Sequence, residues 1–223
     1  MSGADLLTPP AIAAPPPDCP LCPRLLAYRQ ANRQAEPGWF NAPVPSFGPT
    51  SAAILIVGMA PGLKGANRTG RPFTGDHAGL LLYQTLLRFG LASGSYGADP
   101  NDGLALQDCR IANAVRCVPP ANLPEPGEVG TCNRFLEAEL RGLSRLRAVL
   151  ALGVLAHAAV LKGCGIPVAS IRFRHGAIHE LPDGLLLADS YHVSRYNTAT
   201  RRLTPEMFER VVSDLLQRLR QAG

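Results

Sequence analysis

Short apolar runs alternate with stretches of helical periodicity along most of the chain, and this alternation restricts the fold more than any other feature. The clearest run is residues 52–58, AAILIVG, in which no polar side chain interrupts the apolar ones. Such a run is typical of a strand covered on both faces in a parallel sheet, because a strand with one wet face alternates apolar and polar residues. Strands are predicted at residues 52–58, 110–115, 148–152 and 185–188.

Helices are predicted between and after these strands. Leucines recur at helical spacing before Gly90, and the last helix has Thr204 as its N-cap and Pro205 in its first position. The expected helices span residues 25–34, 77–89, 128–146, 154–162 and 205–220, and residues 171–181 form a hairpin-like stretch. Strands that alternate with helices predict an α/β fold, a three-layer α/β/α arrangement around a central, mainly parallel four-stranded sheet.

The length of 223 residues suits one well-buried domain, expected over residues 18–223. Residues 1–17 are rich in Pro and Ala and predict a disordered or extended arm, without the basic start and apolar core of a secretory signal. The longest apolar stretch, residues 148–156, is too short to span a bilayer. We therefore expect a soluble, cytoplasmic protein, and we expect it to be a monomer.

The chain is modestly basic, with a net charge of +5 and a pI near 9.1. This balance favours a polyanionic partner. The basic residues are nearly all Arg, which a GC-rich genome would also produce. Because Lys64 and Lys162 are the only lysines, few amines are present for Schiff-base chemistry.

Three predicted strands run into segments with unusual polar residues. A glycine-rich loop with Asp76 follows the first strand, Asn113 lies in the second, and His192 follows the last. Ligands of open α/β sheets bind beyond the carboxyl ends of the strands, so a carboxylate, an amide and an imidazole are expected to converge on one site. The loop matches neither a Walker phosphate loop nor the dinucleotide fingerprint, and a plain strand-to-helix turn with Asp76 as N-cap is the alternative.

Five segments stand in a defined order: CPLC (19–22), GMAPG (58–62), GANRTGRPFTGD (65–76), NAVRC (113–117) and HVSRYN (192–197). GMAPG and HVSRYN resemble the first and last motifs of the uracil-DNA glycosylase superfamily. The other three segments are similar to its prokaryotic type 5 branch, over about residues 19–219. The resemblance implies a monofunctional DNA repair glycosylase. It would hydrolyse the N-glycosidic bond of uracil and other damaged or deaminated bases in DNA by base flipping, without a lyase step.

The resemblance also implies residue roles. Asp76 would stabilise the cationic sugar and His192 the departing base anion, as the catalytic residues. Asn113 would read the edge of the base and Phe73 would stack on it. The base-binding residues would be Gly58, Ala60, Gly62, Phe73 and Asn113, and the DNA-binding residues Arg68, Arg71, Arg195 and Tyr196.

Two positions of the first motif depart from other members of the superfamily. Many members carry Asp, Asn or Glu where Ala60 stands, a side chain that positions the attacking water. Strict uracil enzymes carry a Tyr where Gly62 stands, and its ring blocks the 5-methyl group of thymine. The resemblance therefore implies catalysis without a water-polarising side chain at Ala60 and a broad specificity that includes 5-substituted uracils.

Four of the six cysteines form a plausible thiolate set: Cys19 and Cys22 in a CxxC, with Cys117 and Cys132 far along the chain. Four thiolates suit zinc as well as an iron–sulfur cluster. The resemblance implies a [4Fe–4S] cluster of structural function. Cys109 and Cys164 are expected to be buried apolar residues, and the remaining histidines, His77, His157, His175 and His179, to be structural.

Other functions compete with the glycosylase. A non-catalytic iron–sulfur protein that binds DNA or senses redox state would make Asp76 and His192 dispensable. A hydrolase of free nucleosides would not need the basic loops around Arg68 and Arg195, because phosphate neutralisation drives binding to a polymer. A lyase that forms a Schiff base is disfavoured, since only Lys64 lies in a motif.

Overall fold

The structure is a computed structural model and describes residues 12–221. Its central sheet has five strands in the order β4-β1-β5-β7-β6. Strands β4, β1, β5 and β7 are parallel, and β6 is antiparallel to β7. The strands are β1 (Ile54–Gly58), β4 (Cys109–Asn113), β5 (Ala148–Leu152), β6 (Ile178–Glu180) and β7 (Leu186–Ser190), with a separate two-stranded ribbon of β2 (Ala92–Ser93) and β3 (Ala105–Leu106).

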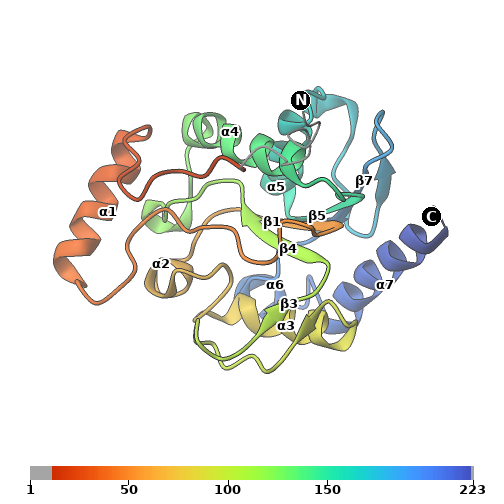
Figure 1. The fold of residues 1–223 in the computed structure, drawn as a ribbon, viewed down its shortest axis with the longest axis horizontal. Helices are drawn as coiled ribbons and strands as arrows, with labels where there is room; N and C mark the ends of the chain where they lie inside the picture. The colour runs from red at the N-terminus through yellow and green to blue at the C-terminus, as the bar shows by residue number, and fades with distance from the viewer. Residues whose placement is uncertain (1–11, 222–223) are drawn as a thin grey trace, which may run out of the picture.

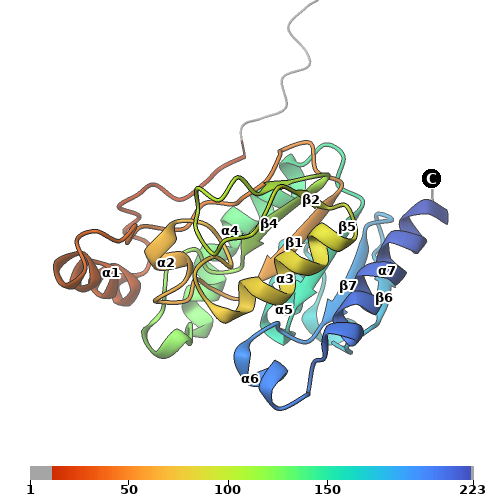
Figure 2. The same ribbon diagram turned by 90° about the horizontal axis from the view of Figure 1, so that it is seen from below.

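Helices cover both faces of this sheet, with α4 and α5 on one side and α3 and α7 on the other (Figures 1 and 2). Helix α1 stands at one end of the molecule, away from the sheet, in both views. The α-helices are α1 (Pro23–Ala35), α2 (Ala66–Thr69), α3 (His77–Arg88), α4 (Pro126–Gly142), α5 (Val154–Gly163), α6 (Arg195–Ala199) and α7 (Pro205–Gln221); two 3-10 turns are η1 (Pro120–Asn122) and η2 (Val168–Ser170). No helix in residues 12–221 is long and apolar enough to cross a membrane.

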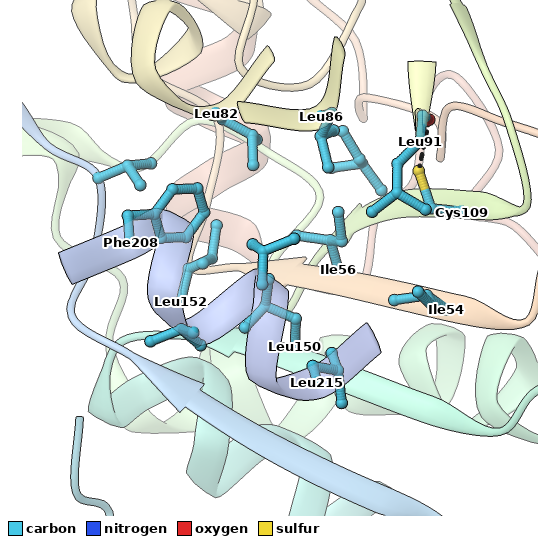
Figure 3. Close-up of a cluster of buried hydrophobic side chains, with 14 of the residues drawn as sticks. Ile54, Ile56, Leu82, Leu86, Leu91, Cys109, Leu150, Leu152, Phe208 and Leu215 are labelled. Carbon is cyan, nitrogen blue, oxygen red and sulfur yellow. Dashed lines mark hydrogen bonds between the residues drawn. The ribbon is translucent and has the colours of Figure 1, made fainter. Parts of the chain in front are cut away.

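The apolar run of β1 is buried along its whole length because its side chains alternate between two cores. Ile54 and Ile56 pack toward α3 and α7, as Figure 3 shows, and Leu55 and Val57 pack toward α4 and α5. Full burial of one such side chain stabilises the fold by about 1.5–3 kcal/mol. The continuous apolar sequence is therefore explained by a strand with two dry faces.

The three-layer prediction is confirmed, but the sheet has five strands rather than four. The fifth strand, β6, lies in the predicted hairpin-like stretch and pairs with β7 across a short turn. Helix α4 begins earlier than predicted, because Glu125 at its N-cap and Glu128 in its first turn form a capping box, and it also ends earlier, at Gly142. The predicted arm falls mostly outside the described residues; of its described part, Ile12 packs against the α4–α5 core.

The strand order defines where a ligand can bind. The chain leaves β1 toward β4 on one side and later returns to β5 on the other, so the order reverses at β1. A crevice opens beyond the carboxyl ends of strands at such a switch point. The loops after β1, β4, β5 and β7 all emerge at this edge.

Candidate active site

A pocket of about 800 Å³ lies at this edge of the sheet. Loops that follow all four parallel strands line it, and they bring together residues far apart in the sequence. Of the predicted site residues, the pocket is lined by Ala60, Gly62, Phe73, Asp76, Asn113, His192 and Arg195. The predicted convergence of a carboxylate, an amide and an imidazole is confirmed.

Asp76 is both the N-cap of α3 and a pocket residue. Its Oδ1 accepts the N–H of Ala78 at 3.1 Å. Its Oδ2 faces the glycine loop: a Cβ at Gly62 would lie 2.8 Å from Oδ2, and a Cβ at Gly65 would overlap the carboxyl group. Burial raises the pKa of the Asp76 carboxyl above its ordinary value, and hydrogen bonds from backbone N–H groups offset part of this rise. One oxygen therefore caps the helix, and the other faces the glycine loop.

Asn113 and Phe73 form the inner end of the pocket. Asn113 is the last residue of β4, and its buried Oδ1 has no hydrogen-bond partner among the described residues. Phe73 is buried with φ +52°, a left-handed conformation unusual for a bulky residue, and Tyr96 donates to its carbonyl at 3.1 Å. A Cβ at Gly58 would overlap both side chains, so this glycine lets the amide and the ring come close together. An unsatisfied buried amide oxygen is costly unless a ligand supplies its donor.

His192 lies in the loop after β7. Its ring centroid is 6.0 Å from that of Phe73, with the planes inclined by 32°. The Asn197 side chain donates to the His192 carbonyl at 2.7 Å and thereby fixes the loop. Burial lowers the pKa of His192 to about 4, so the imidazole is neutral at pH 7.

The four residues predicted to bind DNA do not share one environment. Arg195 lines the pocket and is exposed, at the start of α6. Arg68 and Tyr196 are exposed but lie outside the pocket lining. These three side chains remain free to meet a ligand at the surface.

Arg71 is not a surface residue, contrary to the prediction. Its side chain is 6% exposed, and its Nη1 and Nη2 atoms bind the two carboxylate oxygens of Asp102 at 2.8 and 2.7 Å. The guanidinium also lies over the rings of Phe47, Tyr83 and Tyr96. This ion pair fastens the glycine loop to the β2–β3 segment, so Arg71 cannot also hold a phosphate.

Sequence reasoning missed the part of the pocket contributed by the junction of β5 and α5. Leu152, Gly153, Val154 and Leu155 line it, and none carries a polar side chain that a search for chemistry would find. The position of these residues at a strand's carboxyl end was the available signal. Asn122 was missed as well; it lies in η1 beside Leu123, which is 66% exposed.

The four predicted ligand cysteines lie together at the side of the domain near α1. Cys19, Cys22, Cys117 and Cys132 line one narrow cavity and pack with Leu25 and Phe135. Burial raises the pKa of Cys117 to about 11 and that of Cys132 to about 12. No group of three or more His, Cys, Asp or Glu side chains in residues 12–221 is arranged to hold a single metal ion.

Two of these sulfurs accept hydrogen bonds from buried N–H donors. The guanidinium of Arg29, which is 1% exposed, donates to Cys117 Sγ at 3.2 Å and to the carbonyl of Cys19 at 3.0 Å. The backbone N–H of Arg116 points to Cys132 Sγ at 3.4 Å. Cys109 lies apart in β4 and donates to the Leu91 carbonyl (Figure 3), and Cys164 ends α5.

Taken together, an unsatisfied amide, an aromatic ring, a neutral imidazole and a carboxylate in one pocket define a site for a planar heterocyclic ligand such as a nucleobase. The chain belongs to the uracil-DNA glycosylase superfamily: the family model described as "Uracil DNA glycosylase superfamily" matches residues 45–216. The family resemblance of the sequence motifs is thereby confirmed.

Individual relatives agree with the type 5 branch. The chain is 47% identical to the type-5 uracil-DNA glycosylase of Thermus thermophilus, over 92% of this chain and 94% of that protein. It is 39% identical to the type-5 uracil-DNA glycosylase of Pyrobaculum aerophilum, over 87% and 86% of the two chains. The type-4 uracil-DNA glycosylase of the same organism is 34% identical over only 66% and 62%.

Proposed function

We propose that this chain is a DNA repair enzyme that hydrolyses the N-glycosidic bond between uracil and deoxyribose in DNA. The observation that carries the proposal is the set of Asn113, Phe73, Asp76 and His192 around one pocket in a chain of this superfamily. Because the pocket is recessed between the loops at the carboxyl ends of the strands, a base of duplex DNA must leave the base stack to enter it. Exposed Arg68, Arg195 and Tyr196 are available to hold the DNA outside.

Asn113 is the residue that recognises the base. One side-chain amide both accepts and donates hydrogen bonds, which matches the N3–H and O4 groups on one edge of uracil. The unsatisfied Oδ1 supports this role, since a uracil N3–H would supply the missing donor. Phe73 supplies the face on which the base stacks.

His192 stabilises the base as it leaves with a negative charge. A pKa of about 4 makes its imidazole neutral, so the ring acts as a hydrogen-bond donor rather than as a cation or an acid. The imidazole belongs to a loop whose backbone is held by the Asn197 side chain, which supports its placement before the reaction begins.

Asp76 stabilises the positive charge that forms on the sugar. Its Oδ2 lies against Gly62 and Gly65, in the glycine loop that lines the pocket. Ala60 cannot polarise water, which suits bond breaking that is largely complete before water attacks. The carboxylate therefore acts chiefly by electrostatics.

The enzyme is monofunctional and tolerates bases larger than uracil. Lys64 lines the pocket but is exposed, and Lys162 lies near Gly130 on α4, so neither is a buried amine prepared for a Schiff base. Gly62 leaves the pocket without a side-chain wall at its position. Uracil, 5-substituted uracils such as 5-hydroxymethyluracil, and hypoxanthine are the substrates to compare.

The decisive test is a glycosylase assay on oligonucleotides that carry uracil, 5-hydroxymethyluracil, hypoxanthine or only normal bases. The wild type should release uracil and leave an intact abasic strand, with no borohydride-trapped complex. Asp76→Asn and His192→Ala should bind the DNA but release little base. A wild type that releases no base would point to the non-catalytic alternative, and full activity in both variants would contradict the roles given to Asp76 and His192.

The four cysteines are proposed to hold a [4Fe–4S] cluster. They supply only thiolates, and the N–H donors of Arg29 and Arg116 lie against two of the sulfurs, as suits ligands that carry negative charge. A four-iron cluster is larger than a single ion, so its thiolates stand farther apart than those around zinc. When bound, the cluster would supply a cross-link that ties the CxxC segment to the β4 loop and to α4.

The cluster proposal is tested by iron content rather than by activity. Protein purified without oxygen should be brown, and Ala at Cys19, Cys22, Cys117 or Cys132 should remove most of the iron. Cys164→Ala is the matched control, because this partly buried cysteine lies outside the cavity, and it should keep the iron. Colourless wild-type protein with stoichiometric zinc would contradict the proposal.

The cellular setting is proposed from the same chemistry. All six cysteines are free in the structure, as suits a reducing cytoplasm, where the substrate DNA also lies. The monomeric state stays a prediction, to be measured by light scattering.

A further inference from the structure

A loop at residues 171–176 reaches the same edge of the sheet as the pocket, although it contributes nothing to the pocket lining. Strand β6 follows this loop and runs antiparallel to β7, with Ile178 opposite Ala188. The loop therefore lies beside the carboxyl end of β7, from which the His192 loop also emerges.

A buried carboxylate holds this loop. Asp189, the fully buried fourth residue of β7, accepts the backbone N–H of Arg174 at 3.2 Å. The same carboxylate is bonded to His157 on α5 at 2.7 Å and to His179 on β6 at 3.3 Å. A buried carboxylate is costly unless it is fully hydrogen-bonded, and here its partners come from three separate segments. The network fixes the loop relative to both β7 and α5.

A second set of contacts fixes the loop at residues 171–176 relative to the loop that carries His192. The ring of His175 stacks on that of Tyr191 with centroids 4.7 Å apart and planes 6° apart, and His175 Nδ1 accepts the Tyr191 N–H at 3.1 Å. The guanidinium of Arg202 lies 4.7 Å from the centroid of the same tyrosine ring. Tyr191 immediately precedes His192, so the position of the loop is linked to that of the catalytic imidazole.

The loop presents two exposed arginines, Arg172 and Arg174. Neither is paired with a carboxylate among the described residues, and the same holds for Arg195, Arg201 and Arg202 beyond Tyr191. Many arginines elsewhere on the surface have an acidic partner; these are Arg24, Arg33, Arg88, Arg141, Arg145 and Arg218. Arg68, Arg134, Arg147 and Arg220 are also exposed without such a partner, but the segments that carry Arg172, Arg174 and Arg202 both contact Tyr191.

We propose that Arg172 and Arg174 form a second phosphate-binding site, which holds the DNA backbone at some distance from the extruded nucleotide. Asp189 is a positioning residue that keeps the two arginines at the pocket edge. The inference rests on the proposed function and adds to it a contact that the family motifs do not contain. A protein that must bend or grip a duplex gains from cations held rigidly, because their phosphate contacts also set its register on the strand.

The test compares the double variant Arg172→Ala/Arg174→Ala with Arg220→Ala, an exposed arginine near the far end of α7. Affinity for a uracil-containing duplex of about 20 base pairs is measured over a series of salt concentrations. Each lost phosphate contact lowers the slope of log K against log salt by about 0.9, so the double variant should lose about 1.8. Its single-turnover rate at saturating DNA should equal that of the wild type, and Arg220→Ala should change neither quantity.

A trinucleotide with uracil at its centre provides the second arm, since it carries only the phosphates that flank the uracil. The double variant and the wild type should process it equally. An unchanged salt slope on the duplex, or an equal loss on the trinucleotide, would overturn the inference. Failure of the proposed function is distinguishable, because the wild type would then release no uracil from either substrate.

Asp189→Asn tests the positioning role. If the variant folds, as judged by its circular dichroism, it should weaken duplex binding and lower the salt slope while the trinucleotide rate stays near that of the wild type. Loss of the saturated rate with an unchanged slope would refute the positioning role. The exposed arginine variants keep the main proposal testable should Asp189→Asn not fold.

Discussion

Gly62→Ala is expected to damage catalysis through Asp76 rather than through the width of the pocket. A Cβ at position 62 would lie 2.8 Å from Asp76 Oδ2 and 3.9 Å from its Cγ, with no other atom within 4 Å. An ordinary van der Waals separation is about 3.4 Å, so Oδ2 must move by about 0.6 Å. The carboxylate is at the end of a flexible side chain, so the domain should still fold.

The size of the effect follows from this displacement. A misplacement of about 1 Å in a catalytic group costs about a hundredfold in rate, so 0.6 Å should cost roughly tenfold, or about 1.4 kcal/mol in the activation free energy. Gly65→Ala should cost more, because its Cβ would overlap the whole carboxyl group. Gly38→Ala is the matched control, since its Cβ would meet nothing within 4 Å, and it should leave the rate unchanged.

The assay is single-turnover release of uracil from an oligonucleotide, repeated in an Asp76→Ala background. Once the carboxylate is gone, nothing remains for the Cβ to displace, so Gly62→Ala should have almost no further effect. The coupling between positions 62 and 76 would then account for nearly the whole tenfold loss in rate. The reasoning fails if Gly62→Ala is fully active on uracil, or if it costs the same tenfold without Asp76.

Position 62 also bears on specificity. A larger residue there, such as Tyr, must displace Asp76 before it can act as a wall, so it should lower the rate on uracil as well as on bulkier bases. Comparing Gly62→Ala with Gly62→Tyr on uracil and 5-hydroxymethyluracil separates the two effects. A fall in the rate on uracil that is equal in both variants would result from displacement of the Asp76 carboxylate. Any additional fall in the rate on 5-hydroxymethyluracil would result from the tyrosine ring narrowing the pocket.

Three further predictions follow from individual side chains. Asp76→Asn should keep the free energy of unfolding within a few tenths of a kcal/mol, because Asn caps a helix as well as Asp does, yet lower the rate by about 10²–10³, as measured by thermal melts and single-turnover assays. Because burial raises the pKa of Asp76, the wild-type rate should fall on the acid side at a pH above the ordinary pKa of aspartate. In Asp76→Asn the pH–rate profile should be flat through pH 6.5, since the pKa of His192 is lowered to about 4. An inflection of the variant's profile near pH 6.5 would contradict this. Arg71→Met should leave Asp102 unpaired and destabilise the protein by about 3 kcal/mol or more, with no change in the salt dependence of DNA binding.

The sequence places Asn113 and His192 correctly at the pocket because each of them has two signatures. Asn113 and His192 stand at the carboxyl ends of strands that are apolar enough to be recognised, and each belongs to a motif. Val154 and Leu155 line the same pocket but carry no polar atom, so only the strand end could have indicated them. For these two residues, position in the fold was the available signal, and polar chemistry was the missing one.

The error at Arg71 has a different physical origin. Its charge indicated exposure, whereas a partner 31 residues away, Asp102, and three aromatic rings allow the guanidinium to be buried. The pKa of the Asp102 carboxyl is held far below its usual range by this hydrogen bond, so the pair is ionised at any working pH. The charge of the side chain alone cannot distinguish a buried arginine such as Arg71 from an exposed one such as Arg195. Burial of Arg71 depends on a partner that is distant in the sequence.

The pocket depends as much on absent side chains as on those that line it. Gly58 lies where any Cβ would push Asn113 and Phe73 apart, and Gly62 and Gly65 lie where any Cβ would move Asp76. In the proposed mechanism, the first glycine therefore leaves room for base recognition, and the other two leave room for the carboxylate that would act on the sugar. The backbone can thus approach both groups closely, and this close packing suits the preorganisation on which the proposed electrostatic catalysis depends. The glycines of the loop are explained as spacing elements of the reaction centre rather than as sites of flexibility.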